Sequence, residues 1–363
     1  MVVAKTSERK DGLEELREDA HVLLVLTGSL GDVARGCVVP TQLKLERPDL
    51  RLSWVVEDKW SPLVELCSAV DHVIPYSRKA SFYGVPKLWE LLSQFGPFDC
   101  ALDLQRHFKS GFFTRMSGAP RRIGFAPRDA KEGNWLFQTE YIVPCDMNQS
   151  KVYHYVSFVE KLIGTGNRLI EPLETRTNLF GIDRESAEAL IHKLVPEKDS
   201  IWLTCALGSS WESKDWPVSG YQALLKLLQE MPRVKVFLVG DNSQRELGQK
   251  LVAINPCQIT SLAGSTSLPQ LLGLLSRSDV AVGPDTGTGH MASMVDTPYI
   301  GLFGPTDPRR VAPFRYEHLV LSAPVPCRPC GKRKCPGLQT ACMRLLSPQK
   351  VLASIQDILA PLL

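Results

Sequence analysis

The chain has 363 residues, of which 44% are hydrophobic and 22% are charged, and its formal net charge at pH 7 is +3. These proportions are those of a soluble globular protein of two ordinary domains, and the small net charge gives no argument for a nucleic-acid partner. No apolar run reaches the roughly 18–20 residues of a membrane span, and the charged first twenty residues do not resemble a signal peptide. We therefore expect a cytoplasmic protein with a flexible extension over residues 1–20.

Short apolar segments typical of strands alternate with helical patterns along most of the chain. Strands are expected at residues 22–26, 52–56, 72–74, 100–104 and 123–125, then at 201–206, 234–239, 259–262, 280–283, 299–303 and 319–321. Helices are expected at residues 87–95, 219–230, 243–254, 268–276 and 348–362. This alternation predicts an α/β protein with parallel sheets covered on both faces, and the number of strands favours two doubly wound sheets.

The boundary between the two domains is expected within residues 164–183, which are rich in glycine and polar residues and have no regular period. We predict an N-terminal domain over residues 21–175, a C-terminal domain over 176–346 and a C-terminal helix over 347–363. Two facing domains of this kind present the carboxyl ends of their strands to a shared cleft, where ligands bind.

The turn after the first strand, TGSLGD at residues 27–32, places Asp32 at the start of a helix. An aspartate there is most often only a helix cap, although its carboxylate can also act as a base. The glycine spacing fits neither the dinucleotide fingerprint nor the P-loop, which argues against a nicotinamide site and against a P-loop nucleotide site.

The second domain carries the stronger signal, the loop PDTGTGH at residues 284–290 between a strand and a helix. Backbone N–H groups at such a helix start can bind an anion, and an ordinary strand–turn–helix is the alternative. Ser209 follows the strand at residues 201–206, and Lys214 precedes a Trp-Pro pair and can place a charge beside a phosphate, unless it is a solvated surface residue. Gly240 and Glu246 follow the next strand, where an acidic residue can bind ribose hydroxyls or simply favour the helix start.

Taken in order, the segments GSLGDV, SKDWP, the stretch from SLAGSTS to GPDTGTGHMAS, and TPYIGLFGPTDPRRVAPF resemble glycosyltransferase family 9, the bacterial heptosyltransferases. The resemblance runs from about residue 22 to the C-terminus. It implies a GT-B arrangement, with two Rossmann-like domains, an active site in the cleft and a C-terminal helix that crosses back to the N-terminal domain. It also implies inverting, metal-independent transfer of heptose from ADP-heptose to an inner-core sugar of lipopolysaccharide, with peripheral contact at the inner face of the inner membrane.

The same resemblance assigns roles to individual residues. Asp32 matches the family's general base, and Lys214 matches its lysine before Trp-Pro. The residues expected to bind the donor are Ser209, Gly240, Glu246, Asp285, Thr286, Gly287, Thr288, Gly289 and His290. For His290 the alternative role is only to hold the loop in place. Arg35 stands where family members often carry a histidine or another large residue, and it is expected to contact an acidic acceptor. Arg106, Arg121 and Arg122 are further candidates for acceptor contact.

The ten cysteines are unevenly placed. Cys327, Cys330, Cys335 and Cys342 cluster in PCRPCGKRKCPGLQTACM and could together ligate a structural zinc, although the spacing departs from the usual paired motif and free thiols are the alternative. The basic residues of this segment, Arg328, Lys332, Arg333 and Lys334, are candidates for contact with anionic lipopolysaccharide or phospholipid headgroups. No cofactor is expected to be required for catalysis.

Two other functions remain open from the residues alone. One keeps the fold and changes the chemistry, to a GT-B glycosyltransferase or sugar-nucleotide epimerase that uses a UDP- or GDP-sugar. The other is a non-catalytic nucleotide- or zinc-binding assembly protein, which the presence of Asp32 together with Lys214 disfavours.

Overall fold

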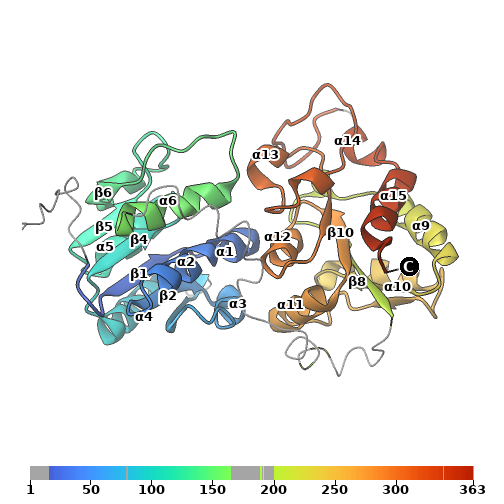
Figure 1. Ribbon diagram of the computed structural model, residues 1–363. Coiled ribbons are helices and arrows are strands. Elements are labelled where there is room, and N and C mark those ends of the chain that lie inside the picture. Colours follow the sequence, from blue (N-terminus) through green and yellow to red (C-terminus); the bar gives the residue numbers. More distant parts are fainter. Residues whose placement is uncertain are drawn as a thin grey trace, which may run out of the picture.

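The protein consists of two α/β domains that lie side by side (Figure 1). A computed structural model describes residues 16–78, 81–164, 189, 191, 200–337 and 339–362. Most of the expected N-terminal extension, and the expected boundary at residue 175, lie outside the described residues. The described part of the first domain ends with a helix at Ile163, and the first strand of the second domain begins at Ile201.

The first domain is built on a parallel sheet with the strand order β3-β2-β1-β4-β5-β6. This order reverses at β1 and β4, and the loops that follow these two strands lie at the switch point, where open α/β sheets bind ligands. The strands are β1 (His21–Val25), β2 (Arg51–Glu57), β3 (His72–Tyr76), β4 (Cys100–Asp103), β5 (Arg121–Gly124) and β6 (Glu140–Tyr141). The helices are α1 (Leu30–Gly36), α2 (Val38–Glu46), α3 (Ser61–Val64), α4 (Ser81–Phe95), α5 (Phe108–Met116) and α6 (Lys151–Ile163), with 3-10 turns η1 (Asp58–Trp60) and η3 (Asn134–Phe137).

The second domain has a parallel sheet with the order β11-β10-β7-β8-β9. Its strands are β7 (Ile201–Ala206), β8 (Val234–Val239), β9 (Ile259–Ser261), β10 (Val280–Pro284) and β11 (Tyr299–Leu302). Its helices are α9 (Val218–Leu227), α10 (Arg245–Val252), α11 (Leu268–Arg277), α12 (Gly287–Met294), α13 (Pro308–Val311), α14 (Ala341–Arg344) and α15 (Pro348–Leu359), with 3-10 turns η5 (Glu212–Lys214), η6 (Leu228–Glu230), η7 (Asn242–Gln244) and η8 (Glu317–Leu319).

Both faces of the first sheet are buried, which explains the continuous apolar run of β1. Val22 and Leu24 join a core with residues of α1, α2 and α6, whereas Leu23 and Val25 join a second core with residues of α4 and α5. Successive side chains of a strand point to opposite faces, so one apolar strand can contribute to both layers.

Two sequence expectations about elements are wrong, and one short strand was missed. Residues 317–319 form the 3-10 turn η8, and Leu321 makes a single bridge to Leu302 where a strand was expected. The two-residue strand β6 was not predicted, because so short a segment has no readable period. Helix α15 does not cross back to the N-terminal domain: Val351, Ile355 and Leu359 lie one turn apart and pack into the core of the C-terminal domain beside α9.

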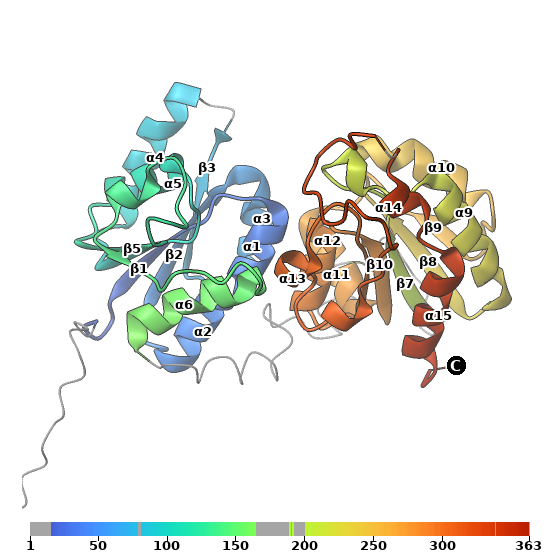
Figure 2. The same cartoon turned by 90° about the horizontal axis from the view of Figure 1, so that it is seen from above.

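The two domains touch through helix starts that carry glycines. Helix α1 lies against α12, and α3 lies against α11 (Figure 2). A Cβ on Gly31 would lie 2.6 Å from Cδ2 of His290, and a Cβ on Gly287 would lie 2.7 Å from the Leu30 side chain. Contacts below 3.0 Å are not tolerated by a real Cβ, so these glycines permit the close approach of the domains.

Candidate active site

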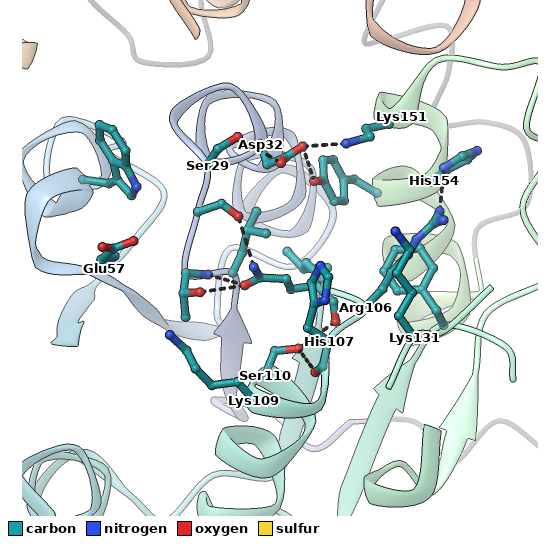
Figure 3. Close-up of a pocket in the computed structure, with 18 of the residues that line it drawn as sticks. Ser29, Asp32, Glu57, Arg106, His107, Lys109, Ser110, Lys131, Lys151 and His154 are labelled. Atoms are coloured by element: carbon teal, nitrogen blue, oxygen red, sulfur yellow. Dashed lines mark hydrogen bonds and ion pairs between the residues drawn. The ribbon is translucent and has the colours of Figure 1, made fainter. Parts of the chain in front are cut away.

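The carboxylate of Asp32 is held at the start of α1 by side chains from two helices. Its Oδ1 accepts hydrogen bonds from Arg35 Nη2 at 2.6 Å and from Lys151 Nζ at 3.0 Å, with the Tyr155 hydroxyl at 3.5 Å. Its Oδ2 accepts one from the Ser29 hydroxyl at 3.1 Å (Figure 3). Burial alone would raise the pKa of Asp32, but the charges of Lys151 and Arg35 outweigh it and hold the pKa well below its usual range. Asp32 is therefore ionised at neutral pH.

A buried contact across the domain interface continues from this cluster. Nη1 of Arg35 lies 2.5 Å from Nε2 and 3.2 Å from Nδ1 of His290. Both side chains are almost fully buried. Burial, followed by the charge of Arg35, holds the pKa of His290 well below its usual value, so the ring is neutral and accepts the hydrogen bond from Arg35.

On the C-terminal domain, the structure brings together two residues from segments far apart in the sequence. Nζ of Lys214 lies 2.8 Å from Asp285 Oδ2 and 4.3 Å from the centroid of the Trp211 ring. Lys214 and Asp285 are 12% and 7% exposed at their side chains, and Oδ1 of Asp285 lies 3.9 Å from Nε2 of His290. The polar side chains thus run without a break from Lys151 through Asp32, Arg35, the neutral ring of His290 and Asp285 to Lys214.

A cavity of about 640 Å³ opens beside Asp32 at the carboxyl ends of the N-terminal strands. Asp32 and Glu57 are the carboxylates among the described residues that line it, against eight basic side chains. These are Lys59, Arg78, Arg106, Lys109, Lys131 and Lys151 of the N-terminal domain and Arg310 and Arg333 of the C-terminal domain. The excess of positive charge favours an anionic ligand in this cavity.

Comparison with known proteins agrees with this geometry. Residues 86–340 match the model of glycosyltransferase family 9 (heptosyltransferase). The chain belongs to glycosyltransferase family 9. It is therefore a glycosyltransferase, and the sequence-based recognition of the family is confirmed.

Relatives of this glycosyltransferase are similar over most of the chain. It is 28% identical over 298 residues to the lipopolysaccharide core heptosyltransferase OpsX of Haemophilus influenzae, covering 81% of this chain and 82% of that protein. It is 26% identical over 367 residues to lipopolysaccharide heptosyltransferase 1 of Pseudomonas aeruginosa, covering 93% and 98%.

Solved structures share the fold of this glycosyltransferase. A family 9 glycosyltransferase from Veillonella parvula superposes with a TM-score of 0.80 at 18% identity, covering 96% of this chain and 100% of that one. The Escherichia coli heptosyltransferase WaaC with ADP superposes with a TM-score of 0.73 at 22% identity, covering 93% and 99%. The predicted two-domain α/β fold of the GT-B type is thus confirmed. Within the described residues, no helix is both long and apolar enough to span a bilayer.

Some of the residues expected at the donor site lie together in the structure, and others do not. Asp285, His290 and Lys214 form one cluster, and the start of α12 places Thr286, Gly287 and Thr288 beside it. A Cβ on Gly289 would meet the ring of Tyr299 at 2.8 Å, so this glycine serves packing.

The remaining donor-side residues have local partners. The Ser209 hydroxyl donates to Asp215 and to the carbonyl of Trp211, and Gly240 lies against Gln244. Glu246 is exposed and pairs with Lys250 at 2.6 Å on the next turn of α10, where its carboxylate faces solvent. The structure does not bring these three residues into the Lys214–Asp285 cluster.

Three of the four arginines expected to contact the acceptor lie elsewhere. Arg35 is 3% exposed and is engaged by Asp32 and His290, so it does not line the cavity. Arg121 and Arg122 stand at the amino end of β5, opposite the cavity; Arg121 binds Glu140, and Arg122 donates to the carbonyls of Phe137 and Ala119. Of the four, Arg106 lines the cavity, where it donates to His154 Nδ1 at 3.2 Å (Figure 3), and its contact with the acceptor stays a prediction.

The cysteine-bearing segment lies against the site loops. Gly331 N donates to the Pro305 carbonyl at 2.7 Å, the Ser213 hydroxyl donates to the Lys332 carbonyl at 2.7 Å, and Arg333 reaches the cavity over the ring of Trp211. Burial and the three neighbouring cysteines raise the pKa of Cys342. None of the four cysteines forms a disulfide bond, and among the described residues no three His, Cys, Asp or Glu side chains are arranged to hold a metal ion. The structural zinc that the spacing allowed stays a prediction.

Sequence reasoning missed Lys151, although one signal was available. Lys151 is the first residue of α6, directly after the N-cap Ser150, whose side chain accepts from Val152 N. A cation is unfavourable at a helix N-terminus because of the helix dipole. A lysine at that position therefore suggests a nearby anion, which the structure identifies as Asp32.

Proposed function

We propose that this glycosyltransferase transfers heptose from ADP-heptose to a sugar hydroxyl in the inner core of lipopolysaccharide, with inversion and without a bound divalent metal. The names of the relatives from Haemophilus influenzae and Pseudomonas aeruginosa support the reaction class. The single observation that carries the chemistry is an ionised Asp32 at the wall of a basic cavity.

In the proposed reaction, the acceptor hydroxyl oxygen attacks C1 of the heptose from the face opposite to ADP. The bond between C1 and the ADP oxygen breaks, and ADP leaves with the bonding electrons. The hydroxyl proton passes to Asp32. Lys151 and Arg35 donate to Oδ1, whereas Oδ2 accepts a hydrogen bond from the Ser29 hydroxyl, so Oδ2 is the oxygen proposed to take this proton.

The departing ADP needs compensation of its negative charge. Lys214 and the first backbone N–H groups of α12, with the hydroxyls of Thr286 and Thr288, supply positive charge and hydrogen-bond donors for the diphosphate. Asp285 holds Lys214 at 2.8 Å in the structure. Donor binding therefore requires the diphosphate to compete with Asp285 for the lysine.

The acceptor side of the proposal rests on the basic cavity. Inner-core lipopolysaccharide carries carboxylate or phosphate groups, which Arg106, Lys131 and Arg310 are placed to bind. Because that acceptor is anchored by lipid, the enzyme is proposed to work in peripheral contact with the inner face of the inner membrane.

The test is transfer of radiolabelled heptose from ADP-heptose to a truncated lipopolysaccharide acceptor, with the anomeric configuration of the product read by NMR. Asp32→Asn and Lys214→Met are expected to abolish transfer, whereas Glu246→Ala on exposed α10 is expected to retain it. Activity is expected to persist with EDTA. Full activity of Asp32→Asn would disprove the assignment of the base, and a thermal shift with UDP or GDP exceeding that with ADP would favour the other nucleotide sugars.

A further inference from the structure

A group of exposed apolar side chains lies along the β6 edge of the N-terminal sheet, on the side of that domain away from the C-terminal domain (Figure 1). Leu136 and Val143 are 66% and 68% exposed, and Phe108 is 51% exposed. We call this group the β6-edge patch; its members are Phe108, Phe112, Trp135, Leu136, Tyr141 and Val143. Single exposed apolar residues are ordinary, but a contiguous group marks an interaction surface.

Contacts with η3 connect the parts of the patch on α5 and β6. Phe108 and Phe112, one turn apart on α5, have ring centroids 5.0 and 6.4 Å from that of Phe137 in η3. The Tyr141 hydroxyl donates to the Trp135 carbonyl at 3.2 Å. The patch therefore extends continuously from α5 across η3 to β6.

Buried hydrogen bonds fix the segment that carries the centre of the patch. Asn134 and Gln138, at either end of η3, donate to the carboxylate of Asp103 at 2.6 and 2.9 Å. Asp103 is fully buried at the end of β4. The apolar side chains of η3 are thus presented to solvent from a rigid support.

The patch borders the basic cavity. His107 and Lys109, on either side of Phe108 in the sequence, both line that cavity. Lys131 lines it too, and its backbone N–H donates to the Arg106 carbonyl at 2.8 Å, a few residues before Trp135. Arg115 on α5 is exposed and adds positive charge to the same face.

We propose that the β6-edge patch docks on a bilayer surface with anionic headgroups and brings the cavity to a lipid-anchored acceptor; this rests on the proposed function. Aromatic and aliphatic side chains enter the interfacial region of a bilayer, while neighbouring lysines and arginines attract anionic headgroups. We assign the bilayer contact to the N-terminal domain, because the exposed apolar side chains of the patch lie there. In the basic cysteine segment of the C-terminal domain, Arg333 instead faces the cavity over the ring of Trp211.

Vesicle co-sedimentation tests this surface. The patch variant combines Phe108→Ser, Leu136→Ser and Val143→Ser. The matched control combines Leu45→Ser, Val218→Ser and Leu345→Ser, at apolar residues that are 40%, 46% and 63% exposed on other faces. The wild-type protein and the control are expected to bind phosphatidylcholine vesicles that contain phosphatidylglycerol, and the patch variant to bind at least about tenfold more weakly. Omission of phosphatidylglycerol, or high salt, is expected to weaken wild-type binding.

Equal binding by the patch variant and the wild-type protein would overturn the proposal, as would absence of wild-type binding. A wild-type dimer that dissociates in the patch variant, seen by sedimentation velocity, would assign the surface to a second copy of the chain instead. Heptose transfer to a deacylated, soluble acceptor separates this proposal from the proposed function. The patch variant is expected to keep that activity and lose transfer to the acceptor in vesicles, whereas a wild-type protein inactive on both acceptors would refute the proposed function alone.

Discussion

Replacement of Lys151 by methionine tests whether this lysine orients the catalytic carboxylate. Lys151 and Asp32 are joined at 3.0 Å with side chains 30% and 21% exposed, so their ion pair is neither fully solvated nor fully buried. Exposed pairs contribute at most about 1 kcal/mol, and breaking a buried pair costs about 3–5 kcal/mol; we expect a loss of about 1–3 kcal/mol here. Methionine keeps the length and apolar character of the lysine stem and removes its charge.

The loss is expected in kcat rather than in the KM for ADP-heptose. Arg35 still holds Oδ1 at 2.6 Å, so Asp32 stays ionised, but with one contact fewer its carboxylate is oriented less firmly toward the acceptor hydroxyl. A loss of 1–3 kcal/mol in the transition state corresponds to an about 5- to 150-fold lower kcat. Lys151→Arg is expected to recover most of this activity because it restores the charge.

Steady-state kinetics with ADP-heptose and a soluble acceptor measure these effects. Lys161→Met is the matched control, because Lys161 lies on the same helix and is also ion-paired, to Glu140 at 3.2 Å, outside the cavity. The reasoning would be refuted if Lys151→Met matched the wild-type kcat, if KM for the donor rose with kcat unchanged, or if Lys161→Met lost as much activity.

Three further predictions follow from the interface and the cavity. Gly31→Ala places a Cβ 2.6 Å from His290 and is expected to separate the domains and to lower heptose transfer about tenfold or more. Small-angle scattering measures the separation, and steady-state kinetics measure the transfer. The control Gly337→Ala, whose Cβ would have no atom within 4 Å, is expected to change neither the domain arrangement nor the rate. His290 is neutral in the folded state because its pKa is lowered, so the unfolded chain binds more protons below pH 6.5 and stability falls on acidification. His290→Gln, unlike the exposed His318→Gln, is expected to flatten the pH profile of urea unfolding between pH 7 and pH 5. Arg106→Ala is expected to raise the KM for the acceptor without changing the free energy of unfolding. Arg122→Ala leaves two backbone carbonyls without their hydrogen-bond donor, and it is expected to lower the free energy of unfolding by about 1–2 kcal/mol with the KM unchanged. A raised KM in Arg122→Ala and an unchanged KM in Arg106→Ala would show that our placement of the acceptor is wrong.

The layers of the fold were readable from the sequence because they follow from local patterns. The limits of β7 and β8 agree with the expected residues 201–206 and 234–239, since buried parallel strands are continuous apolar runs between turn residues. The partner of the last helix was not readable. The apolar stripe of α15 indicates that one face of this helix is buried, but it does not indicate which domain the helix packs against.

The same division holds for the site. Asp32, Lys214 and the loop at residues 284–290 were identifiable because their neighbours form ordered motifs around strand ends. The roles of Arg35, Arg121 and Arg122 were not, because a surface arginine, a structural arginine and a binding arginine look alike in sequence. Burial separates them: Arg35 lies in the domain interface and Arg122 caps carbonyls at the far end of β5.

The sequence by itself determined the two-domain architecture, the family and the position of the proposed base, since these depend on residue periodicity and on motifs within short segments. Only the tertiary structure decided that Lys151 holds Asp32, that Arg35 and His290 join the domains, and that six exposed apolar residues form one surface beside the cavity. Each of these contacts joins residues distant in the chain, and their meeting depends on how helices pack on the two sheets, which no local pattern encodes.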